Sequence, residues 1–129
     1  VLPRMLERGK GKLVIMGSVA GYRGLPKAAA YGPTKAALIS LAETLRLELQ
    51  GTGIDVHLVN PGFVATRLTD KNRFSMPAIR TPIQAATAII NGLRGRGFEV
   101  VFPWRFVIWL KLARLLPYWL YFRLAGRLA

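Results

Sequence analysis

A short, unbroken aliphatic run near the start of the chain constrains its fold more than any other feature. Residues 12–16 contain Leu13-Val14-Ile15-Met16 and lead directly into Gly17-Ser18. A run this short, without alternating polar residues, predicts a strand that is buried on both faces, as in a parallel sheet. Apolar runs at residues 54–59 and 98–102 predict two further strands.

Helical patterns separate these strands. Residues 2–8 are typical of the end of a helix, residues 30–50 of a long helix that Gly51 and Gly53 end, and residues 82–93 of a helix that begins at Pro82. Helices and strands that alternate in this order predict an α/β fold with a parallel sheet. Asn60-Pro61-Gly62 is expected to end the second strand, and an irregular loop to follow it.

The sequence Tyr31-Gly32-Pro33-Thr34-Lys35 lies at the start of the long helix. Tyr31 and Lys35 are four residues apart, so they share one helix face. Pro33 is tolerated only in the first helical turn, which places the helix start near Ala30. An apolar stripe continues the same spacing and directs the pair toward the body of the protein, with Ile39 expected off that stripe: Leu38, Ala42, Leu45 and Leu49.

Three polar features are predicted to meet at one edge of the sheet. Ser18 follows the first strand, Asn60-Pro61-Gly62 follows the second, and Tyr31 opens the helix between them. In parallel sheets ligands bind beyond the carboxyl ends of the strands. The sequence therefore predicts a ligand site at this edge.

These residues resemble the short-chain dehydrogenase/reductase family. The similarity rests on Ser18, the Tyr31-x-x-x-Lys35 pair and the segment Pro61-Gly62-Phe63-Val64-Ala65-Thr66, and covers residues 1–103. It implies the C-terminal part of a Rossmann-like, doubly wound parallel sheet. It also implies an NAD(P)-dependent oxidoreductase, one that transfers a hydride between a nicotinamide and a carbonyl or alcohol substrate, and that forms homo-oligomers through the long helix.

The resemblance assigns Tyr31 as the acid and base of this reaction. A free tyrosine titrates near ~10, too high for efficient proton exchange at neutral pH, and a lysine cation one turn away favours the phenolate. Lys35 would thus lower the pKa of Tyr31 and hydrogen-bond the nicotinamide ribose, while Ser18 would orient and polarise the substrate oxygen. By the same resemblance the nicotinamide would be held by Pro61, Gly62, the backbone around Val64 and the Thr66 hydroxyl.

Each of these residues also has a plain structural interpretation. Ser18 could be a turn or cap residue, and Thr66 an N-cap for a short helix near Leu68. Tyr22 competes with Tyr31 for the phenol role, but it has no lysine four residues on and is expected to pack in the loop or line the substrate side. His57 lies between Val56 and Leu58 in a strand and is expected to be structural.

The dinucleotide-binding half of the family's domain is expected to lie before Val1. Such a site uses a strand, a Gly-rich turn and a helix N-terminus to bind the pyrophosphate, and this sequence contains no turn of that kind. The preference for NAD or NADP would be set there. The isolated chain is therefore expected to be inactive, to bind NAD(P) weakly and to associate through its open sheet edge.

Residues 104–129 form a second, separable segment that is basic, rich in aromatic residues and free of acids. They predict one long, basic, apolar helix, whose uncharged run at residues 115–122 is far shorter than the ~20 residues of a membrane span. Two interpretations stay open. Either the segment is an amphipathic helix on an anionic membrane surface, or it packs over the substrate cleft or a subunit interface. In both, its aromatic character favours a lipophilic substrate.

Composition narrows the remaining classes of function. The chain has no cysteine and only one histidine, which excludes a disulfide framework and argues against any Cys- or His-based metal site. The net charge of +13 is scattered without a nucleic-acid-binding motif, so nucleic acid ranks below an anionic cofactor or membrane. The expected location is cytoplasmic or at a membrane surface. The non-enzymatic alternative is a membrane-surface or interaction module derived from a truncated reductase.

Overall fold

The structure, a computed structural model, describes residues 1–65, 69 and 78–128. Its centre is a parallel three-stranded sheet in the order β1-β2-β3. The strands are β1 (Gly11–Met16), β2 (Ile54–Pro61) and β3 (Glu99–Phe102). The predicted α/β class and the three parallel strands are confirmed.

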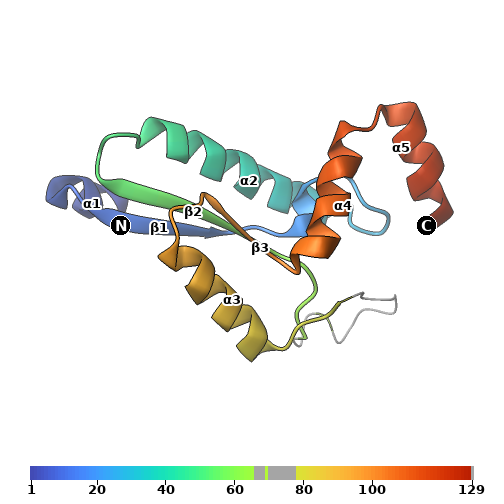
Figure 1. Cartoon of the computed structure of the whole chain (residues 1–129). Coiled ribbons are helices and arrows are strands. Elements are labelled where there is room, and N and C mark those ends of the chain that lie inside the picture. Colours follow the sequence, from blue (N-terminus) through green and yellow to red (C-terminus); the bar gives the residue numbers. More distant parts are fainter. Residues whose placement is uncertain (66–68, 70–77, 129) are drawn as a thin grey trace.

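Helices cover both faces of the sheet (Figure 1). Helix α2 (Tyr31–Glu48) lies on one face and α3 (Pro82–Arg94) on the other, while α1 (Leu2–Arg8) precedes β1. Successive residues of β2 alternate between these layers: Leu58 packs with Ala42 of α2, and Val59 with Ala85 of α3. Burial on both faces explains why the strands are aliphatic without polar alternation.

Local signals in the sequence fix where the helices begin and end. Helix α3 starts with a capping box in which the Thr81 side chain accepts from the Gln84 N–H and the Gln84 side chain accepts from the Thr81 N–H. Helix α1 ends at Gly9, which has a left-handed φ of 62° and donates to Leu6 and Met5 carbonyls. These caps satisfy backbone groups that have no partner within the helix.

The second strand is longer than predicted. Asn60 and Pro61 belong to β2 and do not interrupt it, since Pro61 pairs with Phe102 of β3. Proline is tolerated there because it is the last residue of the strand, and the ladder continues through the Gly62 N–H, which donates to the Phe102 carbonyl at 2.8 Å.

The buried stripe of α2 also differs from the prediction. Ile39 is 5% exposed and lies in the core, whereas Leu38 is only half-buried. The helix face that meets the sheet is therefore rotated toward Gly32, Ile39 and Ala42, all of which are buried. Tyr31 consequently lies at the margin of that face and is 44% exposed.

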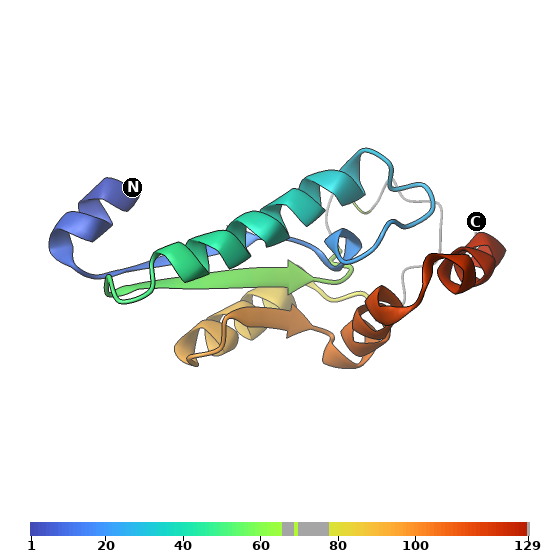
Figure 2. The same ribbon diagram turned by 90° about the horizontal axis from the view of Figure 1, so that it is seen from above.

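The C-terminal segment is not one long helix. It consists of α4 (Trp104–Leu115), α5 (Tyr118–Ala125) and the 3-10 turn η3 (Gly126–Leu128), and Figure 2 shows the corner between α4 and α5. Leu116 and Pro117 between them are extended, with ψ of 137° and 151°. The proline ring clashes with a helical conformation of the residue before it, so the helix ends at this point.

Candidate active site

Ser18 lies at the carboxyl end of β1, where the chain leaves the sheet. It is buried and caps the 3-10 turn η1 (Val19–Gly21), with its Oγ accepting from the Ala20 N–H at 3.2 Å. The preceding Gly17 N–H donates to Val59 of β2 at 2.8 Å, which ties this end of β1 to the sheet. The serine is thus a cap, as its structural interpretation predicts, and also lies where a ligand site is expected.

Tyr31 and Lys35 occupy the first turns of α2. The Lys35 Nζ donates to the Met16 carbonyl at 3.0 Å and lies 5.6 Å from the centre of the Tyr31 ring. Met16 is the last residue of β1, two positions before Ser18. The lysine therefore fixes the start of α2 against the strand end that carries the serine.

Close packing of η1 on α2 brings the serine and the tyrosine to one edge of the sheet. A Cβ on Gly21 would lie 2.7 Å from the Lys35 carbonyl carbon and 2.8 Å from the Ala36 nitrogen. Only a residue without a side chain allows this approach. Ser18, Tyr31 and Lys35 are therefore gathered at the carboxyl end of the sheet, as the sequence predicts.

The end of β2 supplies backbone groups to the same edge. Val64 forms a parallel bridge with Arg80, in which the Ala65 N–H donates to Arg80 and the Arg80 N–H donates to Phe63. In such a bridge the N–H and C=O of Val64 itself point away from Arg80. The Val64 carbonyl accepts from the Thr69 hydroxyl at 2.8 Å. Thr66, predicted to contact a cofactor, and the short helix expected near Leu68 lie outside the described residues.

Tyr22 does not belong to this group. Its hydroxyl donates to Glu99 Oε1 at 2.5 Å, and its side chain packs with Ile39 and Leu58 between α2 and the sheet. Burial, together with the hydrogen bond to the Glu99 carboxylate and its charge, raises the pKa of Tyr22 far above the ordinary value. A phenol held so firmly in its protonated form is a poor acid and base at neutral pH.

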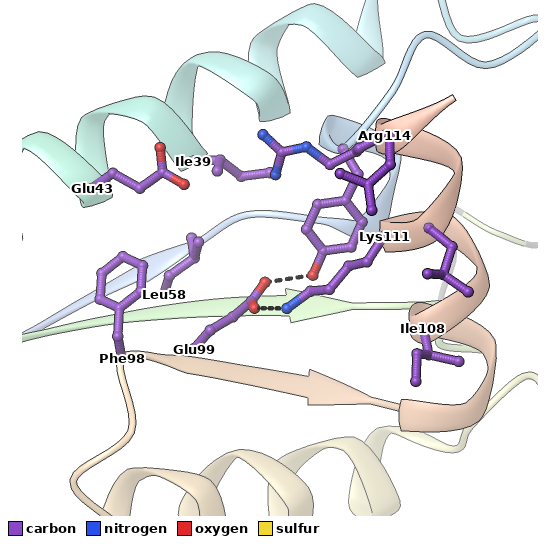
Figure 3. Close-up of a pocket in the computed structure, with 11 residues that line it drawn as sticks. Ile39, Glu43, Leu58, Phe98, Glu99, Ile108, Lys111 and Arg114 are labelled. Atoms are coloured by element: carbon purple, nitrogen blue, oxygen red, sulfur yellow. Dashed lines mark hydrogen bonds and ion pairs between the residues drawn. The ribbon is translucent and has the colours of Figure 1, made fainter. Parts of the chain in front are cut away.

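Glu99 is the centre of a polar network that was not predicted from the sequence. It accepts from Tyr22 and from Asn60 Nδ2, the latter at 2.7 Å. It also accepts from Lys111 of α4, with which it forms an ion pair (Figure 3). Burial alone would raise the pKa of the Glu99 carboxyl, but the hydrogen bonds from Lys111, Tyr22 and Asn60 outweigh it and hold the pKa below its usual range. The sequence offers one signal for this network: a single acidic residue, Glu99, lies between apolar residues in the third predicted strand, and a buried acid requires polar partners.

This network borders a pocket of about 570 Å³ between α2, the sheet and α4. Glu43, Arg114 and Leu115 are also among its lining residues, whereas Ser18, Tyr31 and Lys35 are not. The pocket is therefore a separate space on the α2 face of the sheet. His57, on the opposite face, is buried with its Nδ1 2.9 Å from the Gly97 carbonyl, which agrees with a structural role.

Two negative findings apply to the part of the chain that the structure describes. No helix there is long and apolar enough to cross a membrane. The same residues contain no group of three or more acidic, histidine or cysteine side chains that could hold a metal ion.

With this geometry in place, comparison with known proteins decides the family. The sequence profile of the short chain dehydrogenases matches residues 1–76, more than half of the chain. The chain belongs to the short chain dehydrogenase family. This is the family that Ser18, Tyr31 and Lys35 indicate from the sequence.

Curated relatives of this family extend the match into the C-terminal helices. An uncharacterized oxidoreductase of Myxococcus xanthus is 41% identical over 128 residues, which cover 99% of this chain and 51% of the relative. The ketoacyl reductase HetN of a Nostoc species is 37% identical over 105 residues, covering 78% of this chain and 37% of HetN. The chain thus spans about half the length, or less, of these relatives.

Solved structures of the family share the fold. A short-chain dehydrogenase from Sphingobium yanoikuyae, in complex with NADPH, is 29% identical with a TM-score of 0.71, over 78% of this chain and 41% of that protein. A short chain dehydrogenase from Burkholderia cenocepacia, in complex with NADP, is 26% identical with a TM-score of 0.69. The match covers 78% of this chain and 42% of that protein. The α/β fold of this chain therefore corresponds to part of a Rossmann-like domain.

Proposed function

We propose that this chain carries the proton-transfer residues of an NAD(P)-dependent oxidoreductase that interconverts a carbonyl compound and an alcohol. The observation that supports this most is the arrangement of Tyr31 and Lys35 at the start of α2, fixed by the Lys35–Met16 hydrogen bond beside the buried Ser18. These residue types in this order are those that the family resemblance assigns to proton transfer.

Each side chain has a defined task in the reduction direction. The Tyr31 hydroxyl donates its proton to the substrate oxygen as negative charge develops there, and it takes the proton back when an alcohol is oxidised. The Lys35 ammonium lies 5.6 Å from the centre of the Tyr31 ring, so a positive charge is close to the phenol during the transfer. Because Ser18 Oγ already accepts from Ala20, its own proton is available to donate to the substrate oxygen and orient it.

The nicotinamide end of a cofactor fits the residues present. Lys35 Nζ lies at the strand end where a ribose hydroxyl would be held, and the outward N–H of Val64 can donate to a carboxamide beside Pro61 and Gly62. When bound, the cofactor supplies or accepts the hydride at the substrate carbon. Thr66 remains part of this proposal, although it lies outside the described residues.

The pyrophosphate end is not matched within the described residues. Dinucleotide sites of this kind place a Gly-rich turn between a strand and a helix N-terminus. The turn after β1 leads instead into η1 and the segment 22–30. We therefore expect this chain alone to bind NAD or NADP weakly and to lack turnover.

The activity is tested with the complete protein encoded by the reading frame that contains this chain. Consumption of NADH or NADPH is followed spectrophotometrically with a panel of small and lipophilic carbonyl compounds. Ser18→Ala should lower kcat/KM about tenfold or more, because one hydrogen bond to a charged oxygen is lost. Ser40→Ala, a serine on the exposed face of α2, is the matched control and should keep full activity. Equal activity of both variants would contradict the proposed role of Ser18.

A second candidate function concerns the surface of α4 and α5. Trp109 and Trp119 are 72% and 68% exposed, and Arg105 and Arg123 on the same helices are exposed. Tryptophan at headgroup depth with nearby cations is typical of helices that lie on anionic membranes. We propose that this surface, defined by these four residues, contacts anionic lipid and admits lipophilic substrates.

Co-sedimentation with vesicles tests this surface. The chain should bind anionic vesicles more strongly than neutral ones, and Trp109→Ser combined with Trp119→Ser should reduce binding without unfolding the protein, since both side chains are largely exposed. Equal binding by the double variant and the unchanged chain would refute the membrane surface. In that case, loss of self-association in the double variant would assign the surface to a subunit interface.

A further inference from the structure

Three consecutive residues between Ser18 and Tyr31 are held by the C-terminal part of the chain. Tyr22 donates to Glu99 of β3, Arg23 donates to the end of α4, and the Gly24 carbonyl accepts from the Tyr121 hydroxyl of α5. Figure 1 shows this segment between the start of α2 and the corner of α4 and α5. Residues about 90 positions apart in the sequence are thus joined here.

Arg23 makes the most extensive of these contacts. Its Nη1 donates to the Arg114 carbonyl at 2.9 Å and its Nη2 to the Leu116 carbonyl at 3.1 Å. Because α4 ends before Pro117, these carbonyls have no partner further along a helix, and a cation at a helix C-terminus is favoured by the helix dipole. The guanidinium also lies 4.7 Å from the Tyr118 ring centre and 4.5 Å from that of Tyr121.

The segment that Arg23 anchors has little structure of its own. Within residues 22–30, the Ala28 N–H donates to Leu25 at 3.3 Å, and the Ala28 carbonyl accepts from Gly32 at 2.7 Å. Lys27 has a φ of 60°, an uncommon conformation for a residue other than glycine that persists where the surroundings impose it. Contacts from β3, α4 and α5 therefore determine the path of this segment.

We infer that Arg23 is a positioning residue. Its hydrogen bonds to the α4–α5 corner fix residues 22–30 as the wall of the substrate site beside Tyr31. The C-terminal helices thereby become part of that site. The inference about catalysis rests on the proposed function, whereas the anchoring itself does not. Ser18 and Lys35 are held independently, through η1 and Met16. Loss of Arg23 should therefore disturb substrate binding more than proton transfer.

Hydrogen exchange in the complete protein tests the anchoring. Arg23→Met keeps much of the side-chain length but removes the five guanidinium donors, and Arg23→Lys keeps only the charge. The hydrogen-bonded amides of Tyr22, Ala28 and Gly32, in and beside this segment, should exchange about tenfold faster in Arg23→Met and by an intermediate amount in Arg23→Lys. Opening of the segment no longer breaks the guanidinium hydrogen bonds in Arg23→Met. Arg94→Met, which replaces an exposed arginine at the end of α3, is the matched control and should leave exchange unchanged. Unchanged exchange of these three amides in Arg23→Met would overturn the inference.

Kinetics of the same variants test the link to the substrate site. In Arg23→Met we expect KM for the carbonyl substrate to rise about tenfold while kcat changes less than about threefold and its pH profile is kept. A fall in kcat with unchanged KM would refute a positioning role at the substrate wall. If the unchanged protein shows no turnover but exchange responds as expected, the anchoring stands and the proposed function fails.

Discussion

At the scale of single residues, the candidate site depends on positions where a side chain would not fit. Gly21 lets η1 lie directly on the backbone of α2, and Gly17 faces Asn60, whose Oδ1 would come 2.1 Å from an added Cβ. Both glycines hold the strand end that carries Ser18. From the sequence alone these glycines could be assigned only to a glycine-rich loop. Their close contacts with α2 and with Asn60 could not be predicted, because such contacts join segments that are distant in the sequence.

Gly21→Ala should destabilise the protein by about 1–3 kcal/mol, the usual range for overpacking a well-packed site. The added Cβ would meet backbone atoms of Lys35 and Ala36, which cannot turn aside as a flexible side chain does. Gly24→Ala is the control, since nothing lies within 4 Å of its added Cβ. Denaturant unfolding of both variants measures the difference, and equal stabilities would contradict the packing described here.

Glu99 makes stability depend on pH. Its folded-state pKa lies below its unfolded value, so its contribution is present above the unfolded pKa of about 4.3 and is lost as the pH falls through the lower folded value. Glu99→Gln should therefore be less stable than the unchanged protein at neutral pH, and the gap should narrow as the solution is acidified through this range. Glu43→Gln, an exposed carboxylate of α2, is the control. Thermal unfolding at several pH values measures the gap, and a gap that widens on acidification would refute this account.

At the scale of helices and strands, periodicity and capping predicted most of the fold correctly. The aliphatic runs predicted the three strands. The start of α3 at Pro82 was predicted because the residues that cap this helix are neighbours in the sequence. The rotation of α2 that buries Ile39 was not predicted, since it follows from packing on the sheet. Pro117 is a local signal for the break between α4 and α5, but the apolar composition of residues 104–129 led to the prediction of one long helix, which was wrong.

Helix α4 should contribute to stability as an integral layer of the core. Val107 is 1% exposed and packs with Val19 and Leu58, whereas Leu115 on the same helix is 80% exposed. Val107→Ala should cost about 1–3 kcal/mol, while Leu115→Ala, which removes a larger side chain, should change stability by less than about 0.5 kcal/mol. Chemical denaturation measures both. Equal, small effects would show that α4 does not pack on the sheet.

At the scale of the whole molecule, the candidate site is assembled from segments that are distant in the sequence, namely the end of β1, the start of α2 and the end of β2. The chain spans about half the length of the relatives it matches. The placement of Ser18, Tyr31 and Lys35 at one edge of the sheet could be predicted, because it follows from the order of strands and helices. The anchoring by α4 and α5 could not, because its contacts join residues about 90 positions apart.

The chain studied alone should associate. The outer edge of β1 has no partner strand among the described residues, and Leu41 and Leu47 on the outer side of α2 are 48% and 73% exposed. Unpaired strand edges and exposed apolar side chains favour association. Size-exclusion chromatography over a range of concentrations should show growing species, and calorimetry should show weak NAD(P) binding. A concentration-independent monomer with tight dinucleotide binding would contradict both expectations.

The central claim is that Tyr31 transfers the proton, and it is tested most directly by the turnover of Tyr31→Phe in the complete protein. The ring and its packing are kept while the hydroxyl is lost, and Tyr118→Phe, a largely exposed tyrosine of α5, serves as the control. The account predicts that kcat of Tyr31→Phe falls about 100-fold or more, with the Kd for the dinucleotide nearly unchanged, whereas Tyr118→Phe stays active. Turnover of Tyr31→Phe within about threefold of the unchanged protein would contradict it.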